Sequence, residues 1–228
     1  MQKIVVLTGA GVSAESGIKT FRDAGGLWEG YDIMEVASPQ GFASNPDLVL
    51  DFYNQRRRQL LEVVPNEAHK KIAELELSYD VEIITQNIDD LHERAGSTKV
   101  THLHGELLKA RSTYDENLII DWKKDICVGD KCKHDSQLRP HIVWFGEAVP
   151  MIETAIEITA SADILMIVGT SMQVYPAASL IHYAPEHIPM FFIDPKPNVD
   201  GIYLPNLEVI PEKATVGVSI VADRLAGR

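Results

Sequence analysis

The sequence contains only two cysteines, Cys127 and Cys132, among its 228 residues. Two thiols cannot form the disulfide framework of a small secreted protein, so we expect a reducing compartment. The sequence also lacks any apolar run of the roughly 20 residues that a membrane-spanning helix needs. Its first residues, MQKIVV, do not have the pattern of a signal peptide. These absences predict a cytoplasmic protein that does not associate with a membrane.

Positive charge is scarce as well. The chain has 21 Lys and Arg residues against 33 Asp and Glu residues, which gives a formal net charge of −12. A general affinity for nucleic acid phosphates is therefore not expected, and basic peptides fit this charge better as partners. With 45% hydrophobic and 24% charged residues, the chain can bury a substantial core as one large domain or one and a half.

The N-terminal segment has the pattern of a nucleotide-binding turn. Ile4 to Thr8 is a short, uncharged run that is typical of a strand buried on both faces. At Gly9 to Gly11 the backbone can approach a ligand closely, and Ser13 to Ile18 can begin a helix whose N–H groups favour a phosphate. Such turns also bind flavins or mononucleotides, or serve tight packing alone, so this turn by itself leaves the ligand open.

The continuation of the chain departs from a dehydrogenase fingerprint, in which a second strand ends in an acidic residue about 20 residues further on. Here Thr20 to Trp28 is loop-like and the next strand-like run is Val81 to Thr85, so a segment is inserted. Further strands are expected at 99–103, 164–168, 190–193 and 207–210, alternating with helical segments. This order predicts an α/β fold with a doubly wound parallel sheet.

Polar residues gather where these strands end, which is the edge at which open α/β sheets bind ligands. Gln86 to Asp89 follow the second strand, and Gly169 to Ser171 follow the strand at 164–168. The alternative role of the first group is to cap a helix at 91–95, although a cap needs fewer residues than stand here. His104 follows the third strand, and Gly105 leaves room beside it. We expect His104 to act as a general base near neutral pH, whereas a structural role fits His102.

Two segments between the strands suggest a substrate site. Asn45 and Pro46 mark the start of a helix on which Tyr53 and Arg56, three residues apart, share a face. Val143 to Glu147 is an apolar stretch that could form the edge of a groove for an extended peptide. An ordinary buried strand would have the same pattern.

Taken together, these motifs make the sequence resemble the sirtuins, the NAD-dependent protein-lysine deacylases, over nearly the whole chain. The motifs are GAGVSAESGI (9 to 18), TFRDAGGLW (20 to 28), TQNIDDLHERAG (85 to 96), HLHGE (102 to 106), RPHIVWFGE (139 to 147) and GTSMQVYPAA (169 to 178). The resemblance implies a Rossmann-like large domain, a smaller domain formed by two insertions, and a cleft between them where NAD and an acyl-lysine peptide meet. NAD would be consumed, yielding nicotinamide, O-acyl-ADP-ribose and free lysine.

The resemblance also implies roles for individual residues. His104 would be the catalytic base. The NAD site would comprise Gly9, Ala10, Gly11, Ser13, Phe21, Arg22, Trp28, Gln86, Asn87, Ile88, Asp89, Gly169, Thr170, Ser171 and Ala214. The peptide would contact Val143, Trp144, Phe145, Gly146 and Val174. Asp194 stands where many relatives carry Asn, which puts its adenosine contact in doubt.

Tyr53 and Arg56 match the pair of the bacterial-type, class III branch that removes succinyl and malonyl groups. A guanidinium can bind a carboxylate through two hydrogen bonds, and the tyrosine hydroxyl adds a donor. We therefore expect a desuccinylase and demalonylase as well as a deacetylase. The alternative for Arg56 is one of three solvated arginines on a helix.

A second feature departs from the family. Most sirtuins hold a structural zinc with two cysteine pairs, and a tetrahedral site needs four such ligands. Here Ser112 and Asp115 replace the first pair and leave only Cys127 and Cys132. Asp115 and His134 could complete a weaker site, but we expect the metal to be absent, with the module held by apolar packing.

We expect the large domain to comprise residues 1–30, 78–106 and 140–228, and the small domain residues 31–77 and 107–139. Two other functions share the NAD site, namely a non-catalytic sensor of NAD or ADP-ribose and a protein ADP-ribosyltransferase. The sequence leaves the oligomeric state open, and a monomer is compatible with it.

Overall fold

The structure, a computed structural model, describes residues 1–19, 30–198 and 206–227. Its larger sheet has six strands in the order β3-β2-β1-β7-β8-β9, and all of its neighbouring strands are parallel. The strands are β1 (Lys3–Thr8), β2 (Asp80–Thr85), β3 (Val100–His102), β7 (Ile164–Val168), β8 (Met190–Ile193) and β9 (Leu207–Ile210). The order changes direction at β1, so the expected doubly wound sheet and Rossmann-like fold are confirmed.

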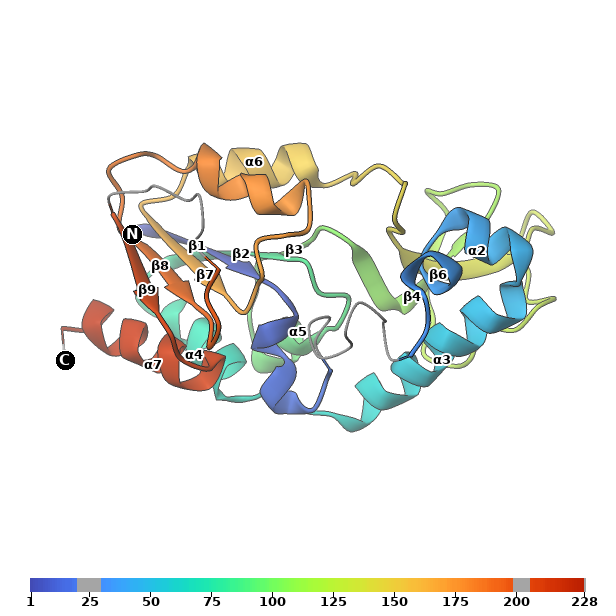
Figure 1. The fold of residues 1–228 in the computed structure, drawn as a ribbon, viewed down its shortest axis with the longest axis horizontal. Coiled ribbons are helices and arrows are strands. Elements are labelled where there is room, and N and C mark those ends of the chain that lie inside the picture. The colour runs from blue at the N-terminus through green and yellow to red at the C-terminus, as the bar shows by residue number, and fades with distance from the viewer. Residues whose placement is uncertain (20–29, 199–205, 228) are drawn as a thin grey trace.

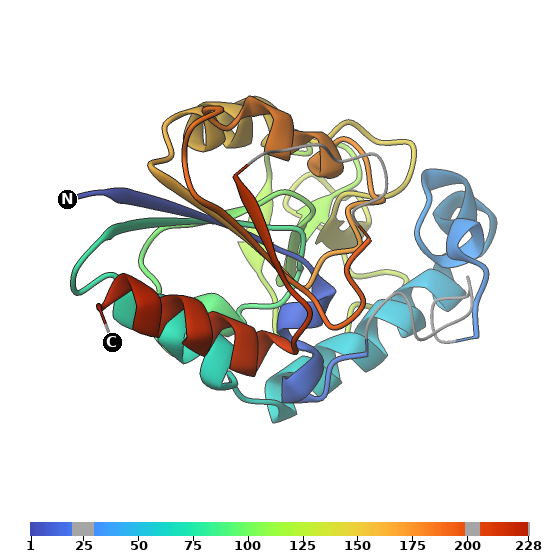
Figure 2. The ribbon, with the colours of Figure 1, turned by 60° about the vertical axis from the view of Figure 1, so that its left-hand side comes forward.

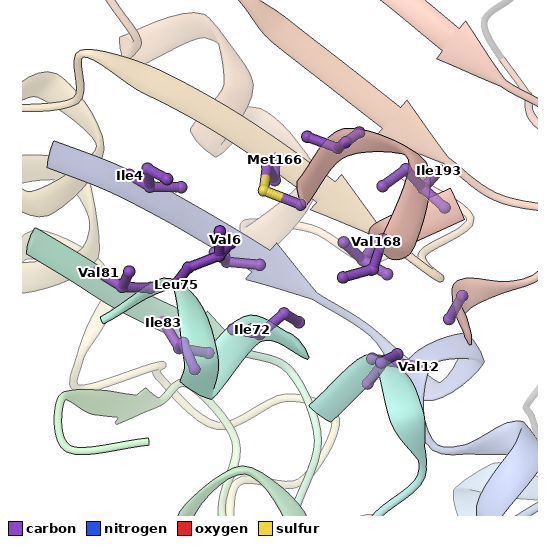
Figure 3. Packing of buried hydrophobic residues seen from close by; sticks show 14 of the residues in the cluster. Ile4, Val6, Val12, Ile72, Leu75, Val81, Ile83, Met166, Val168 and Ile193 are labelled. Atoms are coloured by element: carbon purple, nitrogen blue, oxygen red, sulfur yellow. The ribbon is translucent and has the colours of Figure 1, made fainter. Parts of the chain in front are cut away.

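The central strands are apolar because helices cover both faces of the sheet. Ile4 and Val6 of β1 point into one core, whereas Val5 and Leu7 point into the other. Figure 3 shows the first core, in which Ile72 from a helix packs beside residues of β1, β2 and β7. Each fully buried aliphatic side chain contributes roughly 1.5–3 kcal/mol, so this packing fixes the strand edges that carry the polar residues.

Four helices form the outer layers. Helices α4 (Glu67–Leu75) and α7 (Ala214–Leu225) cover the first core, and α6 (Ile152–Ala160) with the 3₁₀ helix η4 (Ala177–Tyr183) covers the second (Figures 1 and 2). Helix α7 lies very close to β8, because a Cβ on Gly217 would fall 2.2 Å from Ile193 Cγ2. Helix α4 lies within residues 31–77, which we expected in the small domain, but it buries Ala68 and Ile72 against the six-stranded sheet.

A second unit lies beyond the carboxyl ends of the large sheet, at the right of Figure 1. It contains an antiparallel sheet of order β5-β4-β6 and three helices. These elements are β4 (Gly105–Ser112), β5 (Ile119–Asp121), β6 (Leu138–Ile142), α1 (Ile33–Val36), α2 (Pro39–Ser44) and α3 (Pro46–Glu62). Helix α3 begins as expected, since Asn45 Oδ1 accepts a hydrogen bond from Leu48 N and Pro46 occupies the first turn.

The turn after β1 differs from the expectation. We expected a helix to begin over Ser13 to Ile18, but the chain forms two 3₁₀ turns, η1 (Ala10–Val12) and η2 (Ala14–Ser16). The second turn ends at Gly17, whose φ of +98° is incompatible with a continuing right-handed helix. The backbone N–H groups of the turn are used locally, as in the bonds from Val12 N to Gly9 O and from Ser13 N to Ala10 O.

In the part of the chain that the structure describes, no helix has the length and apolar character needed to cross a membrane.

Candidate functional site

A cavity of about 810 Å³ lies at the carboxyl ends of β1, β2, β7 and β8, against the second unit. This size is in the range of sites for small molecules and cofactors. Of the residues singled out in the sequence, the cavity is lined by Gly9, Ala10, Gly11, Tyr53, Gln86, Asn87, Ile88, Asp89, His104, Val143, Trp144, Phe145, Gly146, Gly169, Thr170, Ser171, Val174 and Ala214. Segments far apart in the sequence thus meet around one space.

The turns after β1 and β7 touch each other. Gly11 N donates a hydrogen bond of 2.8 Å to Gly169 O, and Gly169 has a φ of +62°. A Cβ on Gly11 would lie 2.6 Å from Gly169 Cα, and one on Gly169 would lie 2.4 Å from Val12 N. These glycines are therefore required for the contact between the two loops, and both loops also line the cavity.

The side chains after β2 form a buried polar cluster with the first turn. Asn87 Nδ2 donates to Ser13 Oγ at 3.1 Å, and Ser13 Oγ donates to Asp89 Oδ2 at 2.9 Å. Asp89 Oδ1 accepts from Leu91 N, the first residue of α5 (Leu91–Ala95), at 3.1 Å, although the N-cap of this helix is Asp90, which makes no side-chain cap bond. Burial raises the pKa of Asp89, and the hydrogen bonds from Leu91 N and Ser13 oppose that rise. Ser13 itself is fully buried behind the cavity wall.

His104 is well placed to accept a proton in the cavity. Its Nδ1 lies 2.9 Å from Gln86 O. A carbonyl oxygen can only accept, so Nδ1 carries the hydrogen and Nε2 keeps the lone pair of the neutral ring. Burial lowers the pKa of His104, while the bond to Gln86 partly offsets this effect. Beside it, Gly105 has a φ of +81°, and a Cβ there would fall 2.1 Å from His141 O.

His102 has a different environment. Its Nδ1 lies 3.1 Å from Asn87 O and its Nε2 lies 2.7 Å from Glu93 Oε1. Burial lowers the pKa of His102, but the hydrogen bond and charge of Glu93 outweigh burial and raise it overall. These partners occupy both ring nitrogens, as a structural role requires.

The two residues expected to read an acidic acyl group are placed differently. Tyr53 lines the cavity, and its hydroxyl accepts a hydrogen bond of 3.0 Å from Trp144 Nε1. Burial raises the pKa of Tyr53 far above 10, so the hydroxyl stays protonated. Arg56 lies behind this wall, where its Nη1 donates to Phe52 O at 2.6 Å and its Cζ stands 3.2 Å from the Phe52 ring centroid. With 9% of its surface exposed, Arg56 is not a solvated helix arginine.

A charged cluster holds the segment that follows β6. The Glu147 carboxylate accepts from Arg139 at 2.6 Å, from Arg111 at 3.0 Å and from Trp144 N at 2.8 Å. Arg139 stacks on the Trp144 ring with its Cζ 3.3 Å from the centroid. Trp144 is consequently buried, whereas Phe145 is 41% exposed at the cavity.

The cavity has further lining residues that the sequence reasoning missed or left in doubt. Asp194, which directly follows β8, is buried in the wall, and its Oδ1 accepts from Lys196 N at 2.8 Å. Glu15 also lines it, and its carboxylate binds Thr215 N and Oγ1 at the start of α7. Both follow the ends of sheet strands, and that position is the signal that could have identified them. The expected residues Phe21, Arg22 and Trp28 lie outside the described residues.

We expected the segment without the zinc ligands to be held by packing of Leu118, Ile119, Ile120 and Trp122, but Ile119 and Ile120 are exposed and hydrogen bonds hold the turn at Ser112. Ser112 Oγ accepts from Tyr114 N at 3.1 Å and from Asp115 N at 3.2 Å, and Cys132 Sγ lies 3.3 Å from it. Asn54 Nδ2 and Oδ1 bind Ile126 O and N, both at 2.9 Å. Ser112 is a neutral alcohol already bonded to backbone, which does not fit a tetrahedral zinc site of thiolates. Within residues 1–19, 30–198 and 206–227, no group of three or more His, Cys, Asp or Glu side chains is arranged to hold a metal.

The chain is similar to known proteins over most of its length. The model of the Sir2 family matches residues 9–176. The chain is 61% identical to an NAD-dependent protein deacylase of Helicobacter pylori over 94% of this chain and 93% of the relative. It is 53% identical to an NAD-dependent protein deacylase of Bacteroides thetaiotaomicron, over 96% and 95% of the two chains.

Solved structures are similar over almost the entire chain. A Sir2 homologue in complex with NAD superposes with a TM-score of 0.88 at 39% identity, covering 99% of this chain and 90% of that one. A Sir2 protein bound to an acetylated peptide superposes with a TM-score of 0.81 at 28% identity, covering 98% and 93%.

Proposed function

The chain belongs to the Sir2 family, the sirtuins, and is an NAD-dependent protein deacylase. We propose the following roles for its residues in this reaction. The cavity would receive NAD from the side of β1 and β7 and the acyl-lysine peptide from the side of Val143 to Gly146. The observation that carries the proposal is that the Nε2 lone pair of a neutral His104 belongs to the same cavity as both groups of residues.

The residues fit a dinucleotide. Gly9, Gly11 and Gly169 let the two loops pack directly on each other and expose glycine backbone at the cavity, which suits a diphosphate. We assign Ala10, Phe21, Arg22 and Trp28 to the NAD site as a whole, Ser13 to the buried support of Asp89, and Thr170, Ser171 and Ala214 to the ribose and adenine side. Gln86 to Asp89 would hold the nicotinamide end.

NAD supplies an activated bond between nicotinamide and ribose. We assign His104 to removing a proton from a ribose hydroxyl, with Nε2 as the acceptor and Gln86 O holding the ring. The Asp89 carboxylate and the Asn87 amide would stabilise positive charge that develops at the sugar as nicotinamide departs. The wall formed by Trp144, Phe145 and Val174 would exclude water and align the peptide.

We further propose that acidic acyl groups are substrates. The Tyr53 oxygen accepts from Trp144 Nε1, and an indole nitrogen has no lone pair to accept in return. The Tyr53 hydroxyl can therefore act as a donor, and an acyl carboxylate at the cavity wall would be a suitable acceptor. Arg56, one helical turn away, would supply the charge.

The organisation of the chain supports a site between two units. We propose that α4 belongs with the six-stranded sheet, so that the first insertion ends before residue 66.

We propose a cytoplasmic enzyme that acts on basic peptides without nucleic acid or membrane, consistent with its net charge of −12. We propose that the module around Ser112 holds no metal, which is supported by the protein partners of the Ser112 hydroxyl.

The test is one assay with acetyl, malonyl and succinyl versions of the same lysine peptide. We expect nicotinamide release that depends on added acyl peptide, with turnover of all three. Release without peptide would indicate an NAD hydrolase or an ADP-ribosyltransferase, and binding of NAD without release would indicate a sensor. Turnover of the acetyl peptide alone would contradict the proposed acyl preference.

A further inference from the structure

A histidine that the proposed reaction does not use is buried behind the nicotinamide end of the cavity. His69 of α4 and Ser13 are 0% exposed, and Asp89 is 6% exposed. Buried polar groups destabilise a fold unless they are hydrogen-bonded. The bonds made by His69 connect the start of α4 to the wall of the cavity.

The direction of these hydrogen bonds is set by the backbone at the start of α4. Asn66 N donates to His69 Nδ1 at 3.3 Å, in the capping box of this helix. A backbone N–H can only donate, so Nδ1 is the acceptor nitrogen and the hydrogen of the neutral ring is on Nε2. Burial lowers the pKa of His69 to about 4, which keeps the ring neutral at physiological pH.

The second nitrogen of His69 continues the chain toward the cavity. Nε2 lies 3.4 Å from Ser13 Oγ, which also accepts from Asn87 Nδ2 at 3.1 Å. Because His69 Nε2 and Asn87 Nδ2 both donate to the serine oxygen, Ser13 Oγ donates its own hydrogen to Asp89 Oδ2, at 2.9 Å. Each donor in the series points the same way, and the series ends on a carboxylate that lines the cavity.

We propose that His69 is a positioning residue for the NAD site, because it holds the Ser13 hydroxyl as a hydrogen-bond donor to the Asp89 carboxylate. The inference rests on the proposed assignment of Asp89 to the nicotinamide end. It assigns a function to a side chain that does not itself line the cavity and that acts through Ser13.

The consequence is a pH dependence of NAD use. Burial raises the pKa of Asp89 and the Ser13 bond lowers it, so a weaker Ser13 bond would let it rise further. The other groups that act on Asp89 are Asp90, whose charge raises its pKa, and His102, whose charge lowers it. His92 of α5 packs on His69 with ring centroids 4.8 Å apart, but burial keeps the pKa of His92 well below 6.5.

The test compares His69→Leu, which removes the donor, with His69→Gln, whose amide N–H can replace it. For His69→Leu we expect kcat/KM for NAD to fall about tenfold, the loss of one hydrogen bond to a charged network. We also expect the acid limb of its pH profile to move to higher pH, and KM for the acyl peptide to change little. His69→Gln should restore most of the activity and the original pH profile.

His92→Gln is the matched control, because the His92 Nε2 contacts Thr8 Oγ1 at 3.1 Å rather than Ser13. A folded His69→Leu enzyme with an unchanged pH profile, or an equal shift in His92→Gln, would overturn the inference. If His69→Leu does not fold, Ser13→Ala must show the same shift, and its absence would overturn the inference equally. Asp89→Asn distinguishes a failure of the proposed NAD site from a failure of the inference about His69. Normal NAD kinetics in Asp89→Asn would refute the role of Asp89 itself. Impaired kinetics in Asp89→Asn together with normal kinetics in His69→Leu would refute only the role of His69.

Discussion

At the scale of single residues, the chemistry depends on protonation states that burial sets. His104 is neutral because burial lowers its pKa, an effect that the bond from Nδ1 to Gln86 O offsets only in part; that bond fixes the hydrogen on Nδ1. His102, two residues away, has a raised pKa because Glu93 is bound to it. The two histidines thus differ in protonation because their partners differ, which supports the proposed role of His104 as the base and of His102 as a structural residue.

The lowered pKa of His104 predicts how activity depends on pH. Proton abstraction needs the neutral ring, and neutral His104 persists below pH 6.5 until the pH falls through its lowered pKa. We therefore expect kcat/KM for the acyl peptide to stay near its plateau at pH 6.5 and to decline only at lower pH. NMR titration of the His104 ring, compared with the rate profile, checks this. An acid limb of the kcat/KM profile centred above pH 7 would contradict the assignment of His104 as the base.

Arg56→Met tests the acyl preference. The loss of one hydrogen bond from a charged donor weakens binding of the acyl carboxylate by about 1.5–3 kcal/mol, so kcat/KM for desuccinylation should fall at least about tenfold. Deacetylation should be retained, because an acetyl group offers no carboxylate. Arg58→Met is the control on the same helix, since Arg58 is exposed and paired with Asp125. Equal loss of both activities in Arg56→Met would show that Arg56 does not read the acyl group.

At the scale of elements, the cavity depends on the contact between the turns after β1 and β7. We expect Gly169→Ala to destabilise the protein by roughly 1–3 kcal/mol or more and to abolish NAD use, because the added Cβ meets the backbone of Gly11 and Val12. Gly129→Ala is the control, since Gly129 also has a positive φ but no atom within 4 Å of the added Cβ. Urea unfolding measures the free energy of unfolding of both variants. Equal stabilities of the two variants would contradict the steric argument.

The segment around Ser112 gives a second prediction at this scale. Its turn is held by hydrogen bonds from Tyr114 N and Asp115 N to the serine oxygen, which supports the expectation that no metal is bound there. We expect substoichiometric zinc in the purified protein and the same thermal midpoint with or without a chelator, because only a bound structural metal links chelation to unfolding. A double variant, Ser112→Cys with Asp115→Cys, is the positive control for metal analysis. Stoichiometric zinc in the natural sequence would refute this account.

At the scale of the whole molecule, local patterns predicted the strands and the polar edge of the sheet well. The apolar run Ile164 to Val168 is a strand, and Gln86 to Asp89 lie at the cavity as expected. Contacts between residues far apart in the sequence could not be predicted from these local patterns. The turn at Gly9 to Gly11 serves packing and lines the cavity at once, and Arg56 packs on Phe52 behind the wall. The placement of α4 followed from apolar contacts with distant strands, which sequence order does not reveal.

The central claim is that one cavity brings the sugar of NAD, an acyl-lysine and the His104 imidazole together. The most direct test is mass spectrometry of the products from an acyl peptide and NAD, for the natural enzyme and for His104→Ala. We predict one O-acyl-ADP-ribose and one nicotinamide for each lysine freed, and a rate lower by at least about 100-fold without the imidazole. Release of the acyl group as a free carboxylic acid without O-acyl-ADP-ribose, or an undiminished rate in His104→Ala, would contradict the claim.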